Sequence, residues 1–301
     1  MRAATAYVPA TCGELVQGMH DGGHFLVSCP IDLFAAVTVE VAEEGRVHAP
    51  PDCPKAAAAL RAALAFFGAE ERGVRLRVDS PIPRSKGMGS STADVAGAIY
   101  ALAAALGRRI SPSQVADLAL AVEPTNSSLF PGLALLDHRS GTRREEIGPP
   151  PPAEILVLDC GGEVDTLAYN AVDRTEVLHS LAPQVAEALD LVREGVARRD
   201  LDLVGQGATL SARAHQAVLP KAPLEAAIAL GRQAGAAGVC AAHSGTVLGV
   251  LFPPDRARHA EVAREFALAL PGVAVLGWRR LIGGGCYGAG SAACRTADAL
   301  A

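Results

Sequence analysis

Residues 83–93 carry the strongest chemical signal in the sequence. They read Pro-Arg-Ser-Lys-Gly-Met-Gly-Ser-Ser-Thr-Ala and lie between an expected strand and an expected helix. Gly87 and Gly89 allow backbone angles that other residues resist, so consecutive amides can point at one spot. The helix that follows adds the positive end of its dipole. The segment therefore predicts a phosphate-binding loop made of Pro83, Arg84, Ser85, Lys86, Gly87, Met88, Gly89, Ser90, Ser91 and Thr92.

The side chains of this loop fit the same chemistry. Lys86 could place a positive charge at the phosphates, and a serine hydroxyl could bind a magnesium ion that accompanies a nucleotide. The loop lacks the Gly-Lys-Ser/Thr ending of a Walker A motif. A well-capped helix after a glycine turn is the simpler interpretation, and the loop taken alone does not decide between the two. A cap contributes only about 1 kcal/mol, which does not account for two glycines, a lysine and three hydroxyls together.

Two weaker clusters lie elsewhere in the chain. Glu123 begins the run Glu-Pro-Thr-Asn after an expected helix, and its carboxylate could complete a magnesium site with a loop serine. Residues 242–246 read Ala-His-Ser-Gly-Thr and form a turn of small residues between two expected strands. Considered singly, Glu123 is better explained as a solvated charge at a helix end, and the turn as a simple hairpin.

The hydrophobic patterns predict the elements that must position these clusters. Strands are expected at residues 26–29, 35–41, 74–78, 155–158, 239–242, 247–252 and 273–276, and helices at residues 56–67, 93–106, 112–122, 175–198, 201–215, 223–234 and 256–270. Because these elements do not alternate as regular βαβ units, the α+β class is favoured. The proline run at residues 149–152 fits neither a helix nor a central strand. It predicts a boundary between domains at residues 1–148 and 153–301.

Composition limits the kinds of function. The 301 residues suffice for two domains, and 50% of them are hydrophobic. A net charge of −5 argues against nucleic acid as a partner. The seven cysteines show no Cys-x-x-Cys spacing, so neither a disulfide framework nor a zinc site is expected. No apolar stretch approaches the roughly 18 residues of a membrane span, and we expect a cytoplasmic protein with no membrane partner.

The order of these clusters along the chain and their residues resemble the motifs of the GHMP kinases, which include galactokinase, homoserine kinase and mevalonate kinase. Residues 9–14, Pro-Ala-Thr-Cys-Gly-Glu, resemble the first motif, residues 83–93 the phosphate loop and residues 243–246 the third motif. The resemblance implies a two-domain α+β fold, whose N-terminal half is like domain 2 of ribosomal protein S5 and whose C-terminal half is ferredoxin-like. It also implies ATP and Mg²⁺ as cofactors, with the active site in the cleft between the halves.

Within this superfamily the sequence is most similar to the L-threonine kinases of cobalamin synthesis. The likeness lies in residues 9–18, 27–32, 86–88, 123–125, 149–152 and 242–245. It implies that ATP phosphorylates the small-molecule substrate L-threonine to O-phospho-L-threonine, which feeds the aminopropanol arm of the corrinoid. Two alternatives stay open: a kinase for another small alcohol such as homoserine, and a non-catalytic metabolite sensor on the same fold. A homodimer is compatible with the sequence, which does not determine oligomeric state.

This resemblance suggests roles for individual residues. We expect the amides of the loop to hold the triphosphate, Ser91 and Glu123 to bind magnesium, Lys86 to offset phosphate charge and Asn126 to orient the threonine hydroxyl. The residues expected to contact the substrate are Glu14, Cys29, Asp32, His243, Ser244 and Gly245. Asp32 is a candidate partner for the ammonium group of threonine, and an equally fair interpretation makes it a turn residue.

Asn126 departs from the family pattern, because related kinases can carry an aspartate near this position. Asparagine cannot accept a proton, and a general base supplies about 10²- to 10⁴-fold in rate. Phosphoryl transfer depends mostly on positioning and charge stabilisation, since its transition state is loose. The substitution therefore removes a named base and leaves the kinase interpretation in place.

Overall fold

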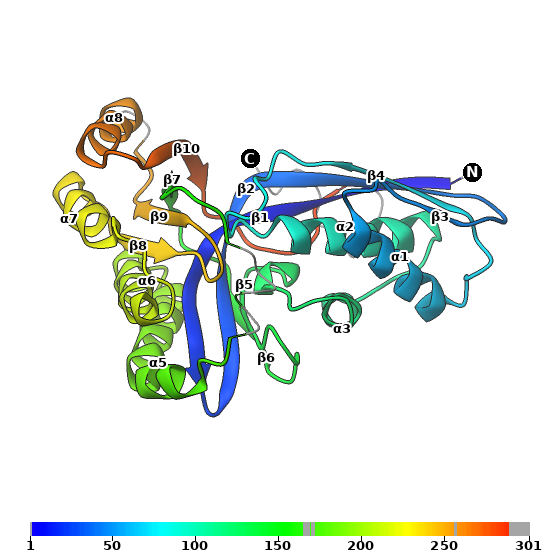
Figure 1. Ribbon diagram of the computed structural model, residues 1–301, viewed down its shortest axis with the longest axis horizontal. Coiled ribbons are helices and arrows are strands. Elements are labelled where there is room, and N and C mark those ends of the chain that lie inside the picture. Colours follow the sequence, from blue (N-terminus) through cyan, green and yellow to red (C-terminus); the bar gives the residue numbers. More distant parts are fainter. Residues whose placement is uncertain (1, 165–168, 170–171, 256–257, 289–301) are drawn as a thin grey trace.

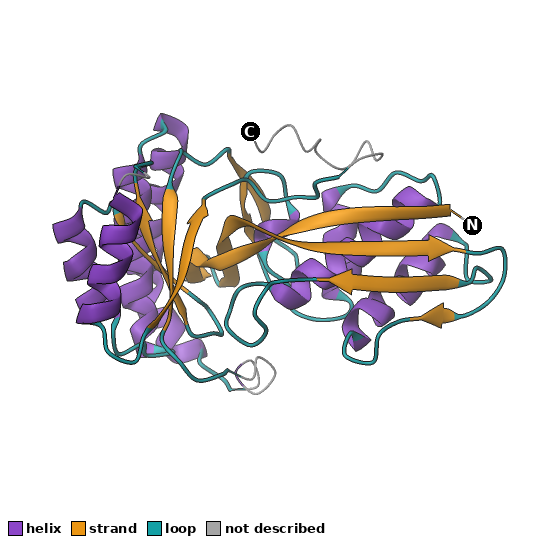
Figure 2. Cartoon of the chain, turned by 90° about the horizontal axis from the view of Figure 1, so that it is seen from above, coloured by secondary structure: helices purple, strands orange, loops and turns teal. Residues whose placement is uncertain are grey.

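A computed structural model describes residues 2–164, 169, 172–255 and 258–288 of the protein (Figure 1). The strands form a sheet that runs through the molecule, and helices cover it in one group at each end (Figure 2). No helix in the described ranges combines the length and apolar character needed to cross a membrane.

A long hairpin forms the spine of the molecule. Its strands are β1 (Arg2–His20) and β2 (Gly23–Val41). Asp21 and Gly22 connect them with φ angles of 52° and 76°, as a two-residue type I′ turn requires. The pairing register shifts three times between Pro9 and Val16. Because such bulges bend a strand, the hairpin turns sharply as it passes from one half of the molecule to the other (Figure 1).

The first half packs three helices against this hairpin. They are α1 (Pro54–Phe67), α2 (Ser90–Ala105) and α3 (Pro112–Leu120), and the sheet continues through β4 (Val74–Asp79) to the short β3 (Val47–His48). Helix α2 is buried along nearly its whole length, as expected of a helix that is apolar all round. Gly97 lets it lie close to the sheet, because a Cβ there would be 2.5 Å from Val37 Cγ2.

In the described part of the second half, four helices cover an antiparallel sheet. The strands are β7 (Glu154–Asp159), β8 (Gly238–Ala241), β9 (Val247–Phe252) and β10 (Ala274–Arg280). The helices are α5 (Thr175–Arg198), α6 (Leu201–Ala214), α7 (Leu224–Ala234) and α8 (His259–Ala269). The link between the halves runs through η1 (Ser127–Leu129), β5 (Leu133–Leu136) and β6 (Arg144–Gly148), and η2 (His215–Ala217) extends α6.

One sheet joins the halves, in the order β10-β7-β9-β8-β1-β2-β4-β3, with β5 on β2 and β6 on β5. The joint is the pair Glu14–Ala241 between β1 and β8. The far end of β1 packs on α5 and α6, so the hairpin contributes to both halves. The domain limits 1–148 and 153–301 stay a prediction, and residues 289–301 lie outside the described part of the chain.

Two expectations from the sequence need correction. Strand β1 was not predicted, and residues 26–29 and 35–41 prove to be parts of one strand, β2. The pattern was hidden because β1 contains Pro9, Gly13 and Gly18, which are rare within strands. Cys286 forms a disulfide, whereas Cys12, Cys29, Cys53, Cys160 and Cys240 are free thiols as expected.

Candidate active site

A cavity of about 710 Å³ lies where segments of both halves meet. Its walls combine the bulged part of β1, the start of α1, the predicted phosphate loop, the segment after α3 and two turns of the second half. The lining includes residues 52–56, 84–85, 87–92, 123–126, 163–164 and 243–244, together with Thr11, Glu14, Leu26, Asp94 and His138. The three sequence clusters therefore share one cavity.

The phosphate loop has the conformation that its glycines predict. Gly87 and Gly89 have φ angles of 79° and 71°. Gly89 is the N-cap of α2, and no side chain caps the helix. The first amides of α2, at Ser90 and Ser91, therefore keep their donor capacity on the cavity wall, where the helix dipole is positive.

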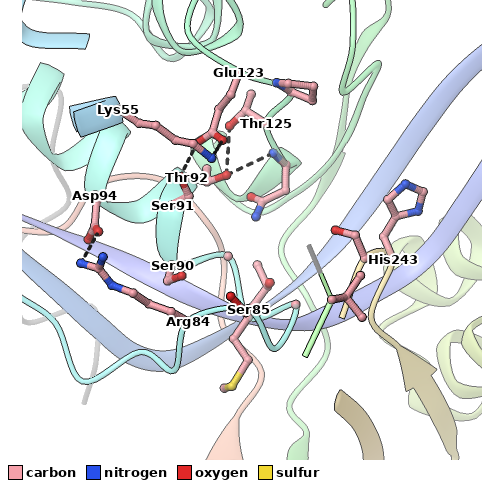
Figure 3. A pocket seen from close by; sticks show the side chains of 18 of the residues that line it. Lys55, Arg84, Ser85, Ser90, Ser91, Thr92, Asp94, Glu123, Thr125 and His243 are labelled. Carbon is pink, nitrogen blue, oxygen red and sulfur yellow. Dashed lines mark hydrogen bonds and ion pairs between the residues drawn. The ribbon is translucent and has the colours of Figure 1, made fainter. Parts of the chain in front are cut away.

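Ser91, Glu123 and Lys55 form a chain of polar contacts across the cavity wall (Figure 3). The Ser91 hydroxyl donates to Glu123 Oε1, and Lys55 Nζ lies 2.5 Å from Glu123 Oε2. The described residues contain no cluster of three or more His, Cys, Asp or Glu for a metal. Two hard oxygen donors fit Mg²⁺, which takes its other ligands from phosphates and water. Lys55 belongs to no recognised motif, and no pattern in the sequence marks it as a site residue.

Asn126 presents a donor to the cavity rather than an acceptor. Its Oδ1 already accepts from Ser128 N at 3.1 Å and from Ser128 Oγ at 2.6 Å. Its Nδ2 faces the loop, because a Cβ on Gly89 would be 2.8 Å away from it. The neighbouring Thr125 hydroxyl donates to Thr92 Oγ1 at 3.1 Å and ties this segment to α2.

Lys86 points away from the cavity, toward the second half. Its Nζ lies 2.9 Å from Asp159 Oδ2 and 2.7 Å from the Gly162 carbonyl. Its carbonyl accepts the amides of Thr246 and Val247 at 2.9 and 3.2 Å. Burial raises the pKa of Asp159, but hydrogen bonds from Thr246 and Lys86 outweigh it and leave that pKa below its usual value. Lys86 thus ties the phosphate loop to the turn after β8.

Gly245 also lies behind the cavity wall. A Cβ on Gly245 would be 2.3 Å from Gly87 Cα, and a Cβ on Gly87 would be 2.5 Å from Ala242 Cβ. The two glycines let the phosphate loop and the third motif touch through their backbones. Pro83 likewise does not line the cavity, whereas Ser244 does.

Buried polar side chains line another part of the cavity. Thr11, Glu14, His138 and His243 each have a buried side-chain atom without a hydrogen-bond partner. Burial raises the pKa of Glu14 to about 8, lowers that of His138 to about 3 and lowers that of His243 well below its usual value. Glu14 and His243 were predicted as substrate residues, and His138 carried no motif.

Like Gly245, the predicted substrate residues Asp32 and Cys29 lie outside the cavity. Asp32 accepts the Arg280 backbone amide at 2.8 Å and Arg280 Nε at 2.9 Å. Cys29 is fully buried next to Cys12 and Cys240.

Arg84 lies on the cavity wall among carboxylates. Its guanidinium is 3.2 Å from Asp52. It also lies 3.8 Å from Asp94 (Figure 3). Burial raises the pKa of Asp94 to about 6, and Arg84 partly opposes this rise. Both carboxylates were missed, because acidic residues at a helix end or on a helix give no distinctive pattern.

Comparison with known proteins places this geometry in a family. Residues 54–131 match the GHMP kinases N terminal domain, and residues 184–270 match the GHMP kinases C terminal domain. The chain is 36% identical to the L-threonine kinase of Salmonella typhimurium over 87% of this chain and 86% of the relative. It is 34% identical to the L-threonine kinase of Citrobacter freundii over 85% of this chain and 88% of that relative.

Solved structures share the fold at lower identity. Homoserine kinase from Cytophaga hutchinsonii aligns with a TM-score of 0.73 and 17% identity over 95% of this chain and 97% of that one. L. major mevalonate kinase in complex with R-mevalonate aligns with a TM-score of 0.68 and 15% identity over 94% of this chain and 96% of that one. These likenesses confirm the two-domain fold expected from the sequence. The chain belongs to the GHMP kinases.

Proposed function

We propose that this kinase transfers the γ-phosphoryl group of ATP to the side-chain hydroxyl of L-threonine, giving O-phospho-L-threonine and ADP. The observation that carries the proposal is the 34–36% identity to two L-threonine kinases over at least 85% of the chain. The cavity geometry supports phosphoryl transfer, because a glycine loop and an uncapped helix start lie beside a serine–carboxylate pair.

The loop and α2 bind the phosphates in this proposal. The amides of Gly87 to Ser91 and the positive end of α2 stabilise the anionic oxygens. Ser91 and Glu123 hold Mg²⁺, which supplies positive charge at the transferred group. Lys55, paired with Glu123, keeps that carboxylate oriented.

The acceptor hydroxyl approaches from the wall that carries Thr11 and Asn126. Both side chains lie next to Gly89, whose Cβ would be 2.8 Å from Asn126 Nδ2 and 3.1 Å from Thr11 Oγ1. Asn126 donates a hydrogen bond to the hydroxyl oxygen and orients it, without taking its proton. Positioning is the main requirement of a loose transition state.

The contacts of Lys86 change its proposed role. Its ion pair with Asp159 favours positioning of the loop over direct contact with phosphate. Asp32 and Cys29 are left out of the proposed substrate site, because Asp32 is engaged by Arg280 and Cys29 is buried within the sheet.

The finer biological assignments belong to the same proposal. The product feeds the aminopropanol arm of cobalamin, and the enzyme works in the cytoplasm on small molecules, without nucleic acid or membrane. A homodimer is compatible with the proposed activity.

A coupled ADP-release assay with L-threonine, L-serine, L-homoserine and mevalonate tests the function. We expect the highest kcat/KM with L-threonine. A preference for L-homoserine would replace the proposed acceptor with that alcohol. ATP binding without acceptor-dependent ADP release would instead support a metabolite sensor.

A further inference from the structure

Buried polar atoms without a partner are rare in folded proteins, and each one calls for an explanation. Six side chains carry such an atom among the residues that the structure describes: Thr11, Glu14, Asp94, His138, Arg143 and His243. All of them except Arg143 line the cavity. Their clustering indicates that a polar ligand completes their hydrogen bonds.

The protonation of His243 can be deduced from its neighbour Gln17. Gln17 Nε2 donates to the Ala241 carbonyl at 2.9 Å, which turns Gln17 Oε1 toward His243 Nδ1, also at 2.9 Å. An amide oxygen only accepts, so Nδ1 carries the ring proton. Burial keeps the ring neutral by lowering its pKa. The unpartnered Nε2 atom is therefore a bare acceptor.

Glu14 supplies a second acceptor nearby. Glu14 pairs with Ala241 across β1 and β8, and His243 follows Ala241 by two residues. Its Oε2 atom is buried and has no donor, although Ser28 hydrogen-bonds to the carboxyl group. When Glu14 is ionised, the two side chains thus place two unsatisfied acceptors in one region of the cavity.

Among the described residues, every cation that lines the cavity is already paired with a carboxylate. The titratable groups around Glu14 are the thiols of Cys12, Cys29 and Cys240 and, on the cavity wall, the neutral imidazoles of His138 and His243. Arg139 and Lys221 lie close enough to help lower the pKa of His243, but neither lines the cavity, and Lys221 Nζ donates to the Ala242 carbonyl at 2.8 Å. Lys55 and Arg84 line the same cavity but are paired with carboxylates. What the region lacks is a positive group that donates several hydrogen bonds. A primary ammonium has this chemistry.

We propose that Glu14, with His243 beside it, binds the α-ammonium group of the acceptor and so selects amino acids over hydroxy acids. This inference rests on the proposed function only in taking an amino acid as the acceptor. It assigns one functional group of that acceptor to one carboxylate, whereas the proposed function concerns the transferred phosphoryl group and the hydroxyl.

Binding should release a proton from Glu14. With a pKa of about 8 in the free protein, Glu14 is mostly protonated at pH 7. An ammonium beside it favours the carboxylate, because opposite charges lower the pKa of an acid. The KM for threonine should therefore fall as pH rises toward 8, as long as the ammonium of threonine stays protonated.

A pair of acceptors tests the inference on the unmodified enzyme. (R)-3-Hydroxybutanoate is threonine without its amino group. We expect kcat/KM for L-threonine to exceed that for (R)-3-hydroxybutanoate on the order of 10²-fold or more, as is typical when one partner of a buried charge pair is missing. Equal values for the two acceptors would overturn the inference.

The variant Glu14→Gln sharpens this comparison. It should lower kcat/KM for L-threonine by a similar factor. It should leave kcat/KM for (R)-3-hydroxybutanoate within about 3-fold of the value for the unmodified enzyme. Glu163→Gln is the matched control, because Glu163 also lines the cavity but is exposed. An equal loss with both acceptors would show that Glu14 acts on the hydroxyl or on the fold, which overturns the inference and leaves the proposed function standing.

Calorimetry gives a readout that needs no turnover. L-Threonine titrated at pH 7 into the unmodified enzyme, in two buffers of different ionisation enthalpy, should release about one proton per site. Glu14→Gln should abolish this release. Threonine binding that releases a proton but leads to no ADP formation would contradict the proposed function and leave the inference standing. Threonine binding without proton release would contradict the inference and leave the proposed function standing. If Glu14→Gln does not fold, two measurements on the unmodified enzyme still test the inference: kcat/KM for the two acceptors, and the number of protons released when threonine binds.

Discussion

In the proposed site, the Ser91 hydroxyl has two partners, the Glu123 carboxylate and a cation bound to the nucleotide. It donates its proton to Glu123 Oε1, so its lone pairs are free to bind the metal. Ser91→Ala removes that ligand without removing buried bulk. We expect kcat to fall on the order of 10²-fold and the Mg²⁺ concentration for half-maximal activity to rise, with Tm changed by only a few degrees. Magnesium activation curves check this, and an unchanged curve would exclude Ser91 as a ligand.

Asn126 allows a test of the mechanism without a base. Its Oδ1 is held by Ser128, and its Nδ2 faces Gly89. Asn126→Asp would put a negative oxygen where the donor is now, next to the phosphates. We expect it to lose at least about 10-fold in kcat/KM, and more than Asn126→Ala, because like charges repel. A variant faster than the unmodified enzyme, with a new ionisation in its pH–rate profile, would instead identify residue 126 as a latent base position.

At the scale of elements, the phosphate loop depends on contact with the second half. A Cβ on Gly87 would be 2.5 Å from Ala242 Cβ, at a φ of +79°. Gly87→Ala should therefore displace the loop and weaken ATP binding by roughly 10- to 100-fold, through strain of about 1–3 kcal/mol. Gly22→Ala is the matched control, because Gly22 has a φ of +76° and open space around it. Equal ATP affinity in both variants would show that the contact with Ala242 does not hold the loop.

The Lys86–Asp159 ion pair supports the same contact from the side chains. If Lys86 acts through Asp159, then Lys86→Met and Asp159→Asn should lose similar activity, and the double variant should lose little more. Residues in direct contact couple in this way by about 0.5–3 kcal/mol. ATP affinity and kcat of the four proteins complete the cycle. Additive losses, or full activity in Asp159→Asn alone, would show that Lys86 does not act through Asp159 and would support direct contact of Lys86 with the phosphates.

The sequence predicted the elements better than the contacts between them. The helices at residues 175–198 and 56–67 and the glycine loop could be read from local patterns, because periodicity and positive-φ glycines are local properties. Strand β1 was missed, since its bulges and its Pro9 interrupt the alternation. Lys55 and His138 reach the cavity only through tertiary packing. Asp32 and Lys86 were assigned to ligands, but the fold gives them Arg280 and Asp159 as partners.

At the scale of the whole molecule, the hairpin unites the two halves. Its first part carries the helices of the N-terminal half, and its far end packs on α5 and α6. The bulges between these parts place Thr11 and Glu14 at the cavity. The site therefore forms only when both halves have folded, and its buried titratable groups link the stability of the whole chain to pH.

Buried groups of opposite kind set the direction of this link. The pKa of His138 and of His215 falls to about 3 by burial, so below about pH 6.5 the unfolded chain binds more protons and stability is lost as pH decreases. Glu14 acts in the opposite sense. Because burial raises its pKa from 4.5 to about 8, its contribution is fully present below pH 4.5 and is lost as the pH rises from there to about 8. Burial raises the pKa of Asp94 to about 6, so below pH 6 Asp94 offsets part of the loss of stability caused by the histidines.

The balance predicts a maximum of stability near pH 6.5. Each unmatched group changes the free energy of unfolding by at most about 1.4 kcal/mol per pH unit. Urea unfolding between pH 5 and 8 should show a decline on both sides of the maximum. Glu14→Gln should remove the decline above pH 6.5, and His138→Phe, which keeps a ring beside His24 and His243, should reduce the decline below it. If stability rose steadily from pH 5 to 8, Glu14 would not be protonated in the folded protein, and the proton released on threonine binding would need another source.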